Sequence, residues 1–436
     1  MSNTLNGELG SLVAAGGGKI HTGPFGSQLH ASDYVPEGIP CIMPANMKNS
    51  RVDLSNISFI TEADAQRLSK YIVKENDIVY SRRGDVTQKA LIRKSEAGYF
   101  CGTGCLLLRP GKKFDARFLT YYLSIPKIQN WIVSQAVGAT MPNLNTGILS
   151  SIPFHGPEKP EQERVANVLS AIEEKIELNN RINTELEAMA KTLYDYWFVQ
   201  FDFPDDSPQG QGKPYKTSGG KMVYNPTLKR EIPAGWVDCL LGDHVTFKRG
   251  ISYKSGDIQD EGVPFLNLNS FSLSGEFKQT GTKYYNGKFK LESKLDAGEL
   301  VIAITDVTRN ADIIGKAFVI PDVFDDKPLI SCDVACVSSE TFGVAYLEQL
   351  FNSNSYHKYI KHFASGTLVL HLDLQGVKWF KTHLPPSNLL EKFNHHCDSL
   401  FKQRDIVLKE NVYLESLRNW LLPMLMNGQV TVGEAS

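Results

Sequence analysis

The segment of residues 161–198 constrains the fold of this chain more than any other, because it contains neither Pro nor Gly to break a helix. Its apolar residues recur at steps of three and four, as in a helix that packs lengthwise on a partner. At about 1.5 Å per residue the helix would be roughly 57 Å long, and it would need a partner of similar length. The pattern changes phase near Asn179 and Asn180. The apolar positions are Val165, Leu169, Ile172, Ile176, Ile182, Leu186, Met189, Leu193 and Tyr196.

An internal duplication identifies the partner helix. Short motifs from the first part of the chain recur in the same order in the second part, at a nearly constant spacing. The repeated unit is a globular block followed by a long helix, so residues 388–422 are the expected partner, ended by Pro423 and Gly428. The matching segments are 9–10 and 241–242, 38–42 and 262–266, 74–79 and 296–301, 85–88 and 306–309, and 138–140 and 366–368.

The sequence predicts an α+β fold, in which two similar mixed α/β blocks are separated by a long antiparallel two-helix coiled coil and related by a pseudo-two-fold axis. A Pro-, Gly- and Ser-rich connector allows the chain to turn back between the helices. In the first block, strands are expected at 39–43, 77–81 and 100–108, and helices at 62–70 and 114–137. The predicted segments are a first block at 1–158, a helix at 159–199, a linker at 200–237, a second block at 238–386, a second helix at 387–427 and a tail at 428–436.

The composition is that of an ordinary globular protein, with 42% hydrophobic and 22% charged residues. No apolar run reaches the length of a membrane span, and the N-terminus lacks the basic and apolar regions of a signal peptide. The seven scattered cysteines favour reduced thiols, and we expect a cytoplasmic protein without a membrane partner. The formal net charge of −2 is unlike that of a stand-alone non-specific DNA binder, so any contact with nucleic acid would use local patches or basic partners.

We find no motif that predicts a catalytic or metal site. The lysine of segment 14–20 is not followed by the Ser or Thr of a phosphate-binding loop, and no zinc-protease motif occurs. Two cysteine pairs, Cys101 with Cys105 and Cys332 with Cys336, alternate with other residues along predicted strands. We therefore expect buried core thiols rather than zinc ligands.

A further set of motifs occurs in a fixed order along the chain. They are Gly-Pro-Phe-Gly-Ser at 23–27, Gly-Ile-Pro at 38–40, Glu-Asn-Asp-Ile-Val at 75–79, Gly-Ala-Thr-Met-Pro-Asn-Leu-Asn at 138–145, Pro-Glu-Gln-Glu-Arg at 160–164 and Glu-Ile-Pro-Ala-Gly-Trp at 231–236. Together, and duplicated in part, these motifs resemble the specificity subunits of type I restriction–modification enzymes. The second block departs from the first, since it has Tyr-Lys-Ser-Gly at 253–256 and no proline in its exit motif at 366–373.

The resemblance implies a DNA-recognition subunit that is not itself an enzyme. The two blocks would be target recognition domains that read the two halves of an asymmetric, bipartite target in double-stranded DNA, and the helix pair would set the gap between the halves. Two methyltransferase subunits would use S-adenosylmethionine, and two restriction/translocase subunits would use ATP and Mg²⁺, whereas this chain itself would bind no cofactor. The outward helix faces, with Trp197, Phe198 and Trp420, are the expected docking surfaces.

A reader of DNA sequence places Arg, Lys, Asn and Gln side chains against base edges and phosphates. The turn at 81–89 follows a predicted strand and is the richest in such residues, and the turn at 305–310 is its counterpart. A solvated basic turn is the alternative interpretation of each. The candidate DNA-contacting residues are Ser27, Arg82, Arg83, Gln88, Lys89, Thr140, Asn143 and Asn145 in the first block, and Lys248, Arg249, Tyr253, Lys254, Arg309, Asn310, Thr367 and His371 in the second.

A protein of a different class also fits part of the pattern. A coiled-coil adaptor could space two protein-binding modules without touching DNA. The Arg-, Gln- and Lys-bearing turns in both blocks argue against this interpretation. A self-sufficient nuclease–methylase would need motifs that this chain lacks.

Overall fold

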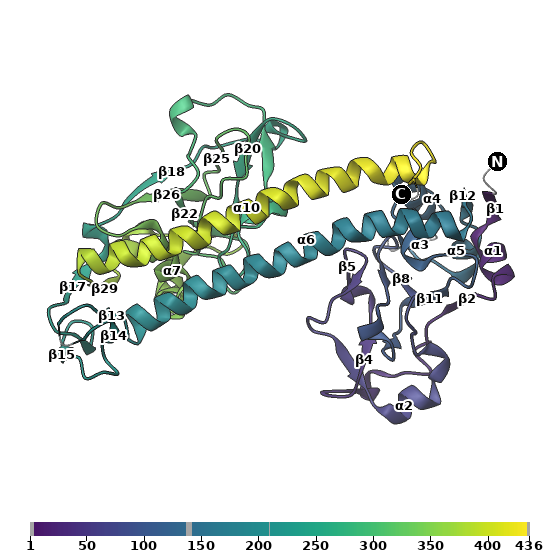
Figure 1. Cartoon of the computed structure of the whole chain (residues 1–436), viewed down its shortest axis with the longest axis horizontal. Coiled ribbons are helices and arrows are strands. Elements are labelled where there is room, and N and C mark those ends of the chain that lie inside the picture. Colours follow the sequence, from purple (N-terminus) through teal and green to yellow (C-terminus); the bar gives the residue numbers. More distant parts are fainter. Residues whose placement is uncertain (1–3, 137–141, 209, 434–436) are drawn as a thin grey trace. The chain divides into compact units, whose positions relative to one another are not determined.

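The structure, a computed structural model, describes residues 4–136, 142–208 and 210–433. It is mixed α/β and divides into two compact units (Figure 1). Unit 1 comprises Met1–Ile176 and Leu414–Ser436, and unit 2 comprises Glu177–Tyr413. The two long helices, α6 (Lys159–Tyr194) and α10 (Ser387–Met426), contribute residues to both units.

Unit 1 contains two four-stranded sheets, a β5–β6 hairpin and a two-stranded ribbon, β1–β12. One sheet has the order β2-β11-β8-β9 and is antiparallel. The other has the order β10-β4-β7-β3, with β10 parallel to β4. The elements before α6 are β1 (Thr4–Glu8), α1 (Leu9–Ala15), β2 (Lys19–Thr22), β3 (Tyr34–Val35), β4 (Ile39–Ile42), β5 (Met47–Lys48), β6 (Arg51–Val52), β7 (Ser58–Ile60), α2 (Glu62–Arg67), β8 (Ile78–Ser81), β9 (Lys89–Leu91), β10 (Phe100–Cys101), β11 (Cys105–Arg109), α3 (Ala116–Tyr122), α4 (Pro126–Gln135), α5 (Thr146–Ser150) and β12 (Pro153–Pro157).

The β8 strand lies between two cores, because successive side chains of a strand point to opposite faces. Ile78 and Tyr80 pack into the core that α3 and the start of α6 complete, whereas Val79 packs into the core between the two sheets. The single strand predicted at 100–108 is two strands, β10 and β11, which belong to different sheets. The turn between them contains Gly104 with a φ of 80°, a conformation that favours glycine.

Unit 2 contains the same sheets in the same order. The sheet β18-β26-β22-β24 matches β2-β11-β8-β9, and β25-β20-β21-β19 matches β10-β4-β7-β3, including its parallel pair. The ribbon β17–β29 precedes α10 as β1–β12 precedes α6. The elements of unit 2 between the long helices are β13 (Pro204–Asp205), β14 (Lys213–Pro214), β15 (Met222–Asn225), β16 (Arg230–Pro233), β17 (Val237–Leu240), β18 (Thr246–Arg249), β19 (Ile258–Gln259), β20 (Val263–Leu266), β21 (Lys283–Tyr285), β22 (Leu300–Ala303), β23 (Thr305–Asp306), β24 (Ala317–Val319), β25 (Leu329–Ile330), β26 (Val334–Ser338), α7 (Val344–Asn352), α8 (Asn354–Ile360), β27 (Ala364–Ser365), β28 (Leu370–Leu372), α9 (Leu374–Lys378) and β29 (Lys381–Leu384).

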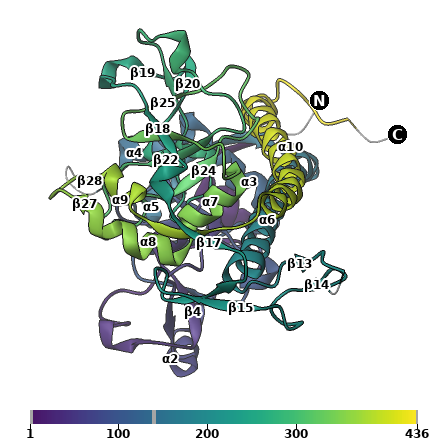
Figure 2. The same ribbon diagram turned by 90° about the vertical axis from the view of Figure 1, so that its left-hand side faces the viewer.

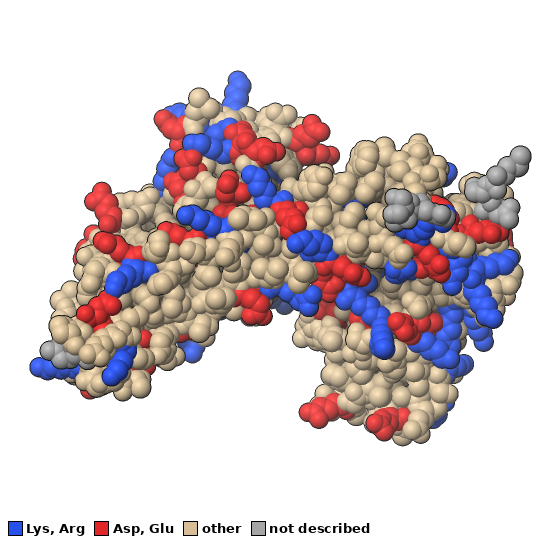
Figure 3. Space-filling model, viewed as in Figure 1, with Lys and Arg blue, Asp and Glu red and all other residues tan. Residues whose placement is uncertain are grey.

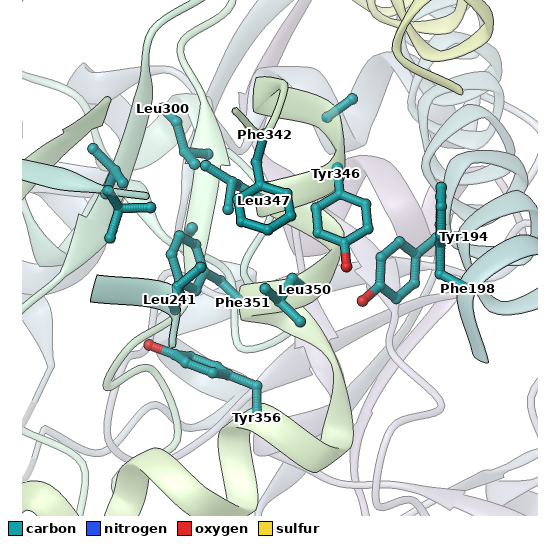
Figure 4. Packing of buried hydrophobic residues seen from close by; sticks show 14 of the residues in the cluster. Tyr194, Phe198, Leu241, Leu300, Phe342, Tyr346, Leu347, Leu350, Phe351 and Tyr356 are labelled. Atoms are coloured by element: carbon teal, nitrogen blue, oxygen red, sulfur yellow. The ribbon is translucent and has the colours of Figure 1, made fainter. Parts of the chain in front are cut away.

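The main core of unit 2 is aromatic (Figure 4). Phe342 stacks on Tyr346 with ring centroids 5.1 Å apart, and Tyr346 also lies 4.9 Å from the ring of Phe198. Trp197 and Phe198 are 4% and 0% exposed, so these two residues belong to the core and not to the docking surface expected from the sequence. Trp420 is 56% exposed and remains available for docking.

The linker predicted at 200–237 packs on this core over its described part. Phe203 stacks between Tyr215 and Trp236, with centroid distances of 4.7 and 5.3 Å, and Phe201 is buried. Figure 2 shows the β13–β14 and β15–β16 hairpins of the linker beside the end of α6. These aromatic residues, rather than the Pro and Gly content, decide the structure of the linker.

Contacts within each unit pair α6 and α10 in antiparallel directions. In unit 2, Asn179 meets Asn411, and the ring of Tyr194 lies 6.2 Å from that of Phe393. In unit 1, residues of the first turns of α6 share a core with Leu425 and Met426, the last residues of α10. α10 therefore continues through Pro423, where the sequence predicted its end, because burial of these two residues offsets the cost of an internal proline.

The change of phase predicted near Asn179 does not occur. The buried stripe of α6 keeps its period because amide side chains occupy positions where an apolar residue was expected. The predicted Met189 and Tyr196 are 55% and 37% exposed instead. After Ile176, the buried positions of the stripe are Asn179, Asn183, Leu186, Ala190 and Tyr194.

The predicted core thiols are buried at Cys101, Cys105 and Cys336. Cys332 is exposed, contrary to expectation, because it precedes β26 and lies outside the sheet. Within the described ranges, no group of three or more His, Cys, Asp or Glu side chains is arranged to hold a metal ion. No described helix is both long enough and apolar enough to cross a membrane.

Candidate nucleic-acid interface

Three separate motifs of the first block meet at one place in unit 1. The turn that follows β8 pairs with the exit segment, since Arg83 forms a β-bridge with Asn143 and the backbone N–H of Leu144 donates to the Arg82 carbonyl at 2.8 Å. The Arg82 guanidinium carbon lies 5.5 Å from the ring centroid of Phe25, in the Gly-Pro-Phe-Gly-Ser loop. Residues far apart in the sequence therefore form one surface.

Arg82 is the centre of this surface. Its Nη1 lies 3.4 Å from the Thr22 hydroxyl, and its backbone N–H donates to the Gly104 carbonyl at 2.8 Å. Its Nε is buried and has no hydrogen-bond partner among the described residues, and the same is true of Asn143 Oδ1. Arg83 beside it is exposed. The surface around Arg82 thus combines polar atoms that lack hydrogen-bond partners with an exposed arginine. Contact with base edges and phosphates requires such groups.

Unit 2 brings the corresponding segments together in the same way. Strand β23, at the start of the turn, pairs with β28 in the exit segment, so that Thr305 lies opposite His371. Arg309 and Asn310 in the turn are exposed, as are Thr367 and His371 in the exit segment. The turn is held by the buried carboxylate of Asp306, which accepts hydrogen bonds from the backbone N–H groups of three residues. These are Thr308 at 2.6 Å, Ile313 at 2.7 Å and Ile314 at 2.9 Å.

The loop after β18 completes the surface of unit 2. Tyr253 packs edge-on against Phe265 at 5.0 Å, and its pKa is raised by burial and by the nearby carboxylate of Asp333. That carboxylate accepts a hydrogen bond from the Thr305 hydroxyl at 2.9 Å, which links the loop to the turn. Arg249 is exposed nearby at the end of β18.

Some candidate residues have local structural roles. The Asn145 side chain caps α5 by accepting a hydrogen bond from the Ile148 backbone N–H at 2.9 Å. Lys248 Nζ donates to the carbonyl of Glu292, and the Lys254 backbone N–H donates to Asp257 Oδ2 at 2.8 Å. Ser27 is exposed in its loop, Gln88 is half-buried, and Lys89 is buried on β9 rather than exposed in the turn. Thr140 lies outside the described residues.

The sequence analysis missed a basic recess of about 250 Å³ next to the Phe25 loop. Its wall includes Lys19 and His21 from β2, Lys70 and Arg109. Burial and the three surrounding cations lower the pKa of His21. Lys and Arg side chains gather on this edge of unit 1, around β2 (Figure 3). No local sequence motif predicts the recess, because its cations come from three segments that are distant in the sequence.

The chain matches the family described as "Type I restriction modification DNA specificity domain" over residues 19–188. It is 23% identical over 425 residues to the type I restriction enzyme MjaIX specificity subunit of Methanocaldococcus jannaschii, covering 92% of this chain and 89% of that protein. It is 21% identical over 430 residues to the HindI specificity subunit of Haemophilus influenzae, covering 88% and 92% respectively.

A solved structure shares the fold. The S subunit of a type I restriction–modification system from M. genitalium superposes with a TM-score of 0.57 at 18% identity, covering 97% of this chain and 96% of that one. The family match lies in unit 1 and the start of unit 2, and the relatives extend the similarity through both units. The chain is therefore similar, over most of its length, to specificity subunits of type I restriction enzymes.

Proposed function

We propose that this chain supplies DNA sequence specificity to a type I restriction–modification complex and that each unit reads one half of a bipartite, asymmetric target in double-stranded DNA. One observation carries the proposal. The turn that follows β8 in unit 1, and the turn that follows β22 in unit 2, each pair with the exit segment that precedes the long helix. Two such surfaces with different side chains suit two different half-sites. The chain acts as a recognition subunit and not as an enzyme by itself.

The two half-sites need a fixed separation, and the paired helices α6 and α10 supply it in this proposal. The half-sites of a DNA reader lie about 34 Å apart for each helical turn between their centres. A helix of 36 residues such as α6 extends about 54 Å at 1.5 Å per residue, which is enough to span one such turn. We assign residues 1–158 and 238–386 to the two target recognition domains, 159–199 and 387–427 to the spacer, 200–237 to the linker and 428–436 to the tail, with the two halves related by a pseudo-two-fold axis.

The partners belong to the same proposal. Two methyltransferase subunits would bring S-adenosylmethionine to the target adenines, and two restriction/translocase subunits would bring ATP and Mg²⁺. In this proposal the subunits dock on the exposed faces of α6 and α10, and the exposure of Trp420 supports this assignment. Because the chain has a net charge of −2, the methyltransferase subunits would supply much of the attraction for phosphates. Such a complex acts on DNA in the cytoplasm.

The test is a methylation map of the host with and without this gene. We expect a bipartite adenine-methylation motif that disappears on deletion and returns on complementation. A footprint of the purified complex on that motif should show sequence-dependent protection of both halves. If neither protection nor a motif depends on the chain, the adaptor interpretation replaces this one.

A further inference from the structure

Lys89 is a buried lysine on β9, and the equivalent position on β24 of unit 2 is not a lysine. Its side chain is 4% exposed, and its Nζ lies 5.9 Å from the ring centroid of Tyr80. Among the described residues, no hydrogen bond or ion pair joins this ammonium group to a partner. The hydroxyl of Tyr80 is also buried and has no partner. Burial lowers the pKa of Lys89 to about 8, against the opposing effect of Asp85. An ammonium group held this way is costly unless an acceptor completes its surroundings.

Lys89 lines a polar recess of about 400 Å³. One wall is the tip of the β5–β6 hairpin, where Asn49 and Ser50 adopt positive φ angles of 49° and 59°. The other walls come from the segment before β9 and from the chain around α3 and α4. Amide and hydroxyl groups dominate the lining, which consists of Met47, Lys48, Asn49, Ser50, Thr87, Gln88, Lys89, Ser124 and Gln129. The recess therefore offers one buried cation, Lys89, together with neutral hydrogen-bond donors and the exposed Lys48, which is paired with Asp53.

In unit 2 the position of Lys89 is occupied by Ala317, because Tyr80 pairs with Lys89 as Ile302 pairs with Ala317. Lys316 precedes Ala317 and matches Gln88, since the Ser81 backbone N–H donates to the Gln88 carbonyl at 2.8 Å as the Ala303 N–H donates to the Lys316 carbonyl at 2.9 Å. Lys316 is also buried, but its Nζ donates to the Asn352 carbonyl at 3.2 Å. A buried lysine at the edge of this sheet is thus satisfied internally in unit 2.

The two units also differ in the residue that ends the packed helix. Asn352 ends α7, and its side chain bonds the backbone of Ala317 at 3.1 and 2.7 Å. Ser124 follows α3 at the corresponding position, and its hydroxyl donates to the Thr120 carbonyl within its own helix segment at 2.9 Å. The shorter serine leaves the space beside β9 open, and the recess occupies it.

We propose that this recess binds an oxyanion, specifically a phosphate group, through Lys89 Nζ and the amide groups of Gln88 and Asn49. An ammonium-to-phosphate hydrogen bond is charge-assisted and restores the partner that burial removes. The phosphate comes either from the DNA backbone or from free phosphate in solution. The first source rests on the proposed function, whereas the second does not.

The experiment measures thermal unfolding of the full chain in inorganic phosphate against chloride of equal ionic strength, because a ligand of the folded state raises its melting temperature. The variants are Lys89→Met and, as a control at a buried lysine that has a partner, Lys316→Met. We expect phosphate to raise the melting temperature of the wild type and of Lys316→Met but not of Lys89→Met. In chloride, Lys89→Met should be at least as stable as the wild type, because methionine fills the site without a charge. Phosphate affinity of the wild type should fall as the pH rises above 8.

The proposal would be overturned if phosphate raised the melting temperature of Lys89→Met as much as that of the wild type. It would also be overturned if both variants lost this rise equally. Equilibrium binding of phosphate gives a second measurement, in which Lys89→Met should weaken affinity by about tenfold or more. This readout does not depend on the stability of the variant.

Binding of the target duplex by the assembled complex distinguishes the two sources. If the phosphate belongs to DNA, Lys89→Met reduces the slope of log affinity against log salt by about 1, and inorganic phosphate competes with the duplex. If the phosphate is free, target affinity is unchanged while phosphate binding is lost. Both results support the oxyanion site. A wild-type complex that showed no sequence preference would refute the proposed function and leave the phosphate result intact.

Discussion

Asn179 of α6 donates a hydrogen bond through Nδ2 to Oδ1 of Asn411 of α10 at 2.9 Å, at a position where the two helices bury both side chains. Asn411 donates in turn to Oδ1 of Asn180 at 2.9 Å, and Asn179 also donates to Oε2 of Glu410 at 2.8 Å. These three hydrogen bonds form in one alignment of the helices and would be lost in others, and only Oδ1 of Asn179 lacks a partner among the described atoms of the pair. The pair thus favours one register for this part of unit 2.

Replacing one of these amides should cost more stability than replacing both. Asn179→Leu leaves Asn411 buried without this partner, which we expect to lower the free energy of unfolding by about 1–3 kcal/mol. The double variant Asn179→Leu/Asn411→Leu should recover most of that loss, because it removes both polar groups together. Denaturant titration followed by circular dichroism measures both. Additive losses in the double variant would contradict the interpretation.

Glu187 should make the protein less stable as the pH rises. Burial, together with the carboxylates of Glu276 and Glu348, raises the pKa of Glu187 to about 8, and Arg404 opposes the shift. The unfolded chain loses this proton near its ordinary pKa of 4.5, so between pH 4.5 and 8 only the folded state keeps it. Stability from this group is therefore complete below pH 4.5 and is lost progressively as the pH rises to 8.

The variant Glu187→Gln separates this effect from the titration of other groups. Because glutamine keeps the neutral form at every pH, the variant should match the wild type near pH 4.5. It should exceed the wild type by about 1–2 kcal/mol at pH 9, after allowance for solvent screening. Unfolding curves at several pH values give the difference. A constant offset between the two proteins would show that Glu187 does not titrate in this window.

Arg83 and Arg309 should each affect one half of the DNA target. Both are exposed in the turn that pairs with the exit segment of their own unit. An arginine that contacts a guanine edge contributes about 1–3 kcal/mol of discrimination at that base pair. We therefore expect Arg83→Ala to relax selection at one or two positions of one half-site and Arg309→Ala to relax the other.

The measurement is methylation of a randomised target library by the reconstituted complex. Each variant is the control for the other, because the unaffected half should retain its sequence and the gap should keep its length. A uniform loss of methylation across all sequences would show that the arginine contacts phosphate instead of a base.

Cys332 should be the first cysteine to react with a thiol reagent in the native protein. It is exposed, whereas Cys41, Cys101, Cys105, Cys336 and Cys397 are buried. Burial raises the pKa of Cys41 to about 12, which keeps that thiol protonated as well as inaccessible. Brief treatment with a maleimide at neutral pH, followed by mass spectrometry, should find a single modified site. In Cys332→Ser that fast reaction should be absent.

The repeated organisation could be read from the sequence, because it depends on patterns that survive divergence. The matching motifs at 74–79 and 296–301 fall in and just before β8 and β22, and the order of the sheets is the same in both units. The surface motifs were recognisable as residue types in turns. Their meeting was not, because the pairings of Arg83 with Asn143 and Thr305 with His371 join segments that only the folded chain brings together.

The wrong predictions for α6 and for Lys89 have a common physical cause. A pattern of apolar residues does not indicate which polar residues are buried. The stripe of α6 was assigned to Met189 instead of Ala190, because Asn179 and Asn183 did not count as seam residues. Lys89 was predicted to contact DNA from an exposed turn, because a lysine is seldom buried. In each case, tertiary surroundings rather than residue type decided the position.

The division of both long helices between the units has a consequence for synthesis. Leu425 and Met426 belong to the same core as Leu106, Phe118 and Leu169, so the N-terminal unit includes the last turns of α10. A ribosome releases these turns only after all of unit 2 has been translated. The block that is made first must therefore wait for the last turns of α10 before its core is complete. A nascent chain stalled before Leu414 would carry an incomplete first reader, exposed to proteases and chaperones, however long it waited.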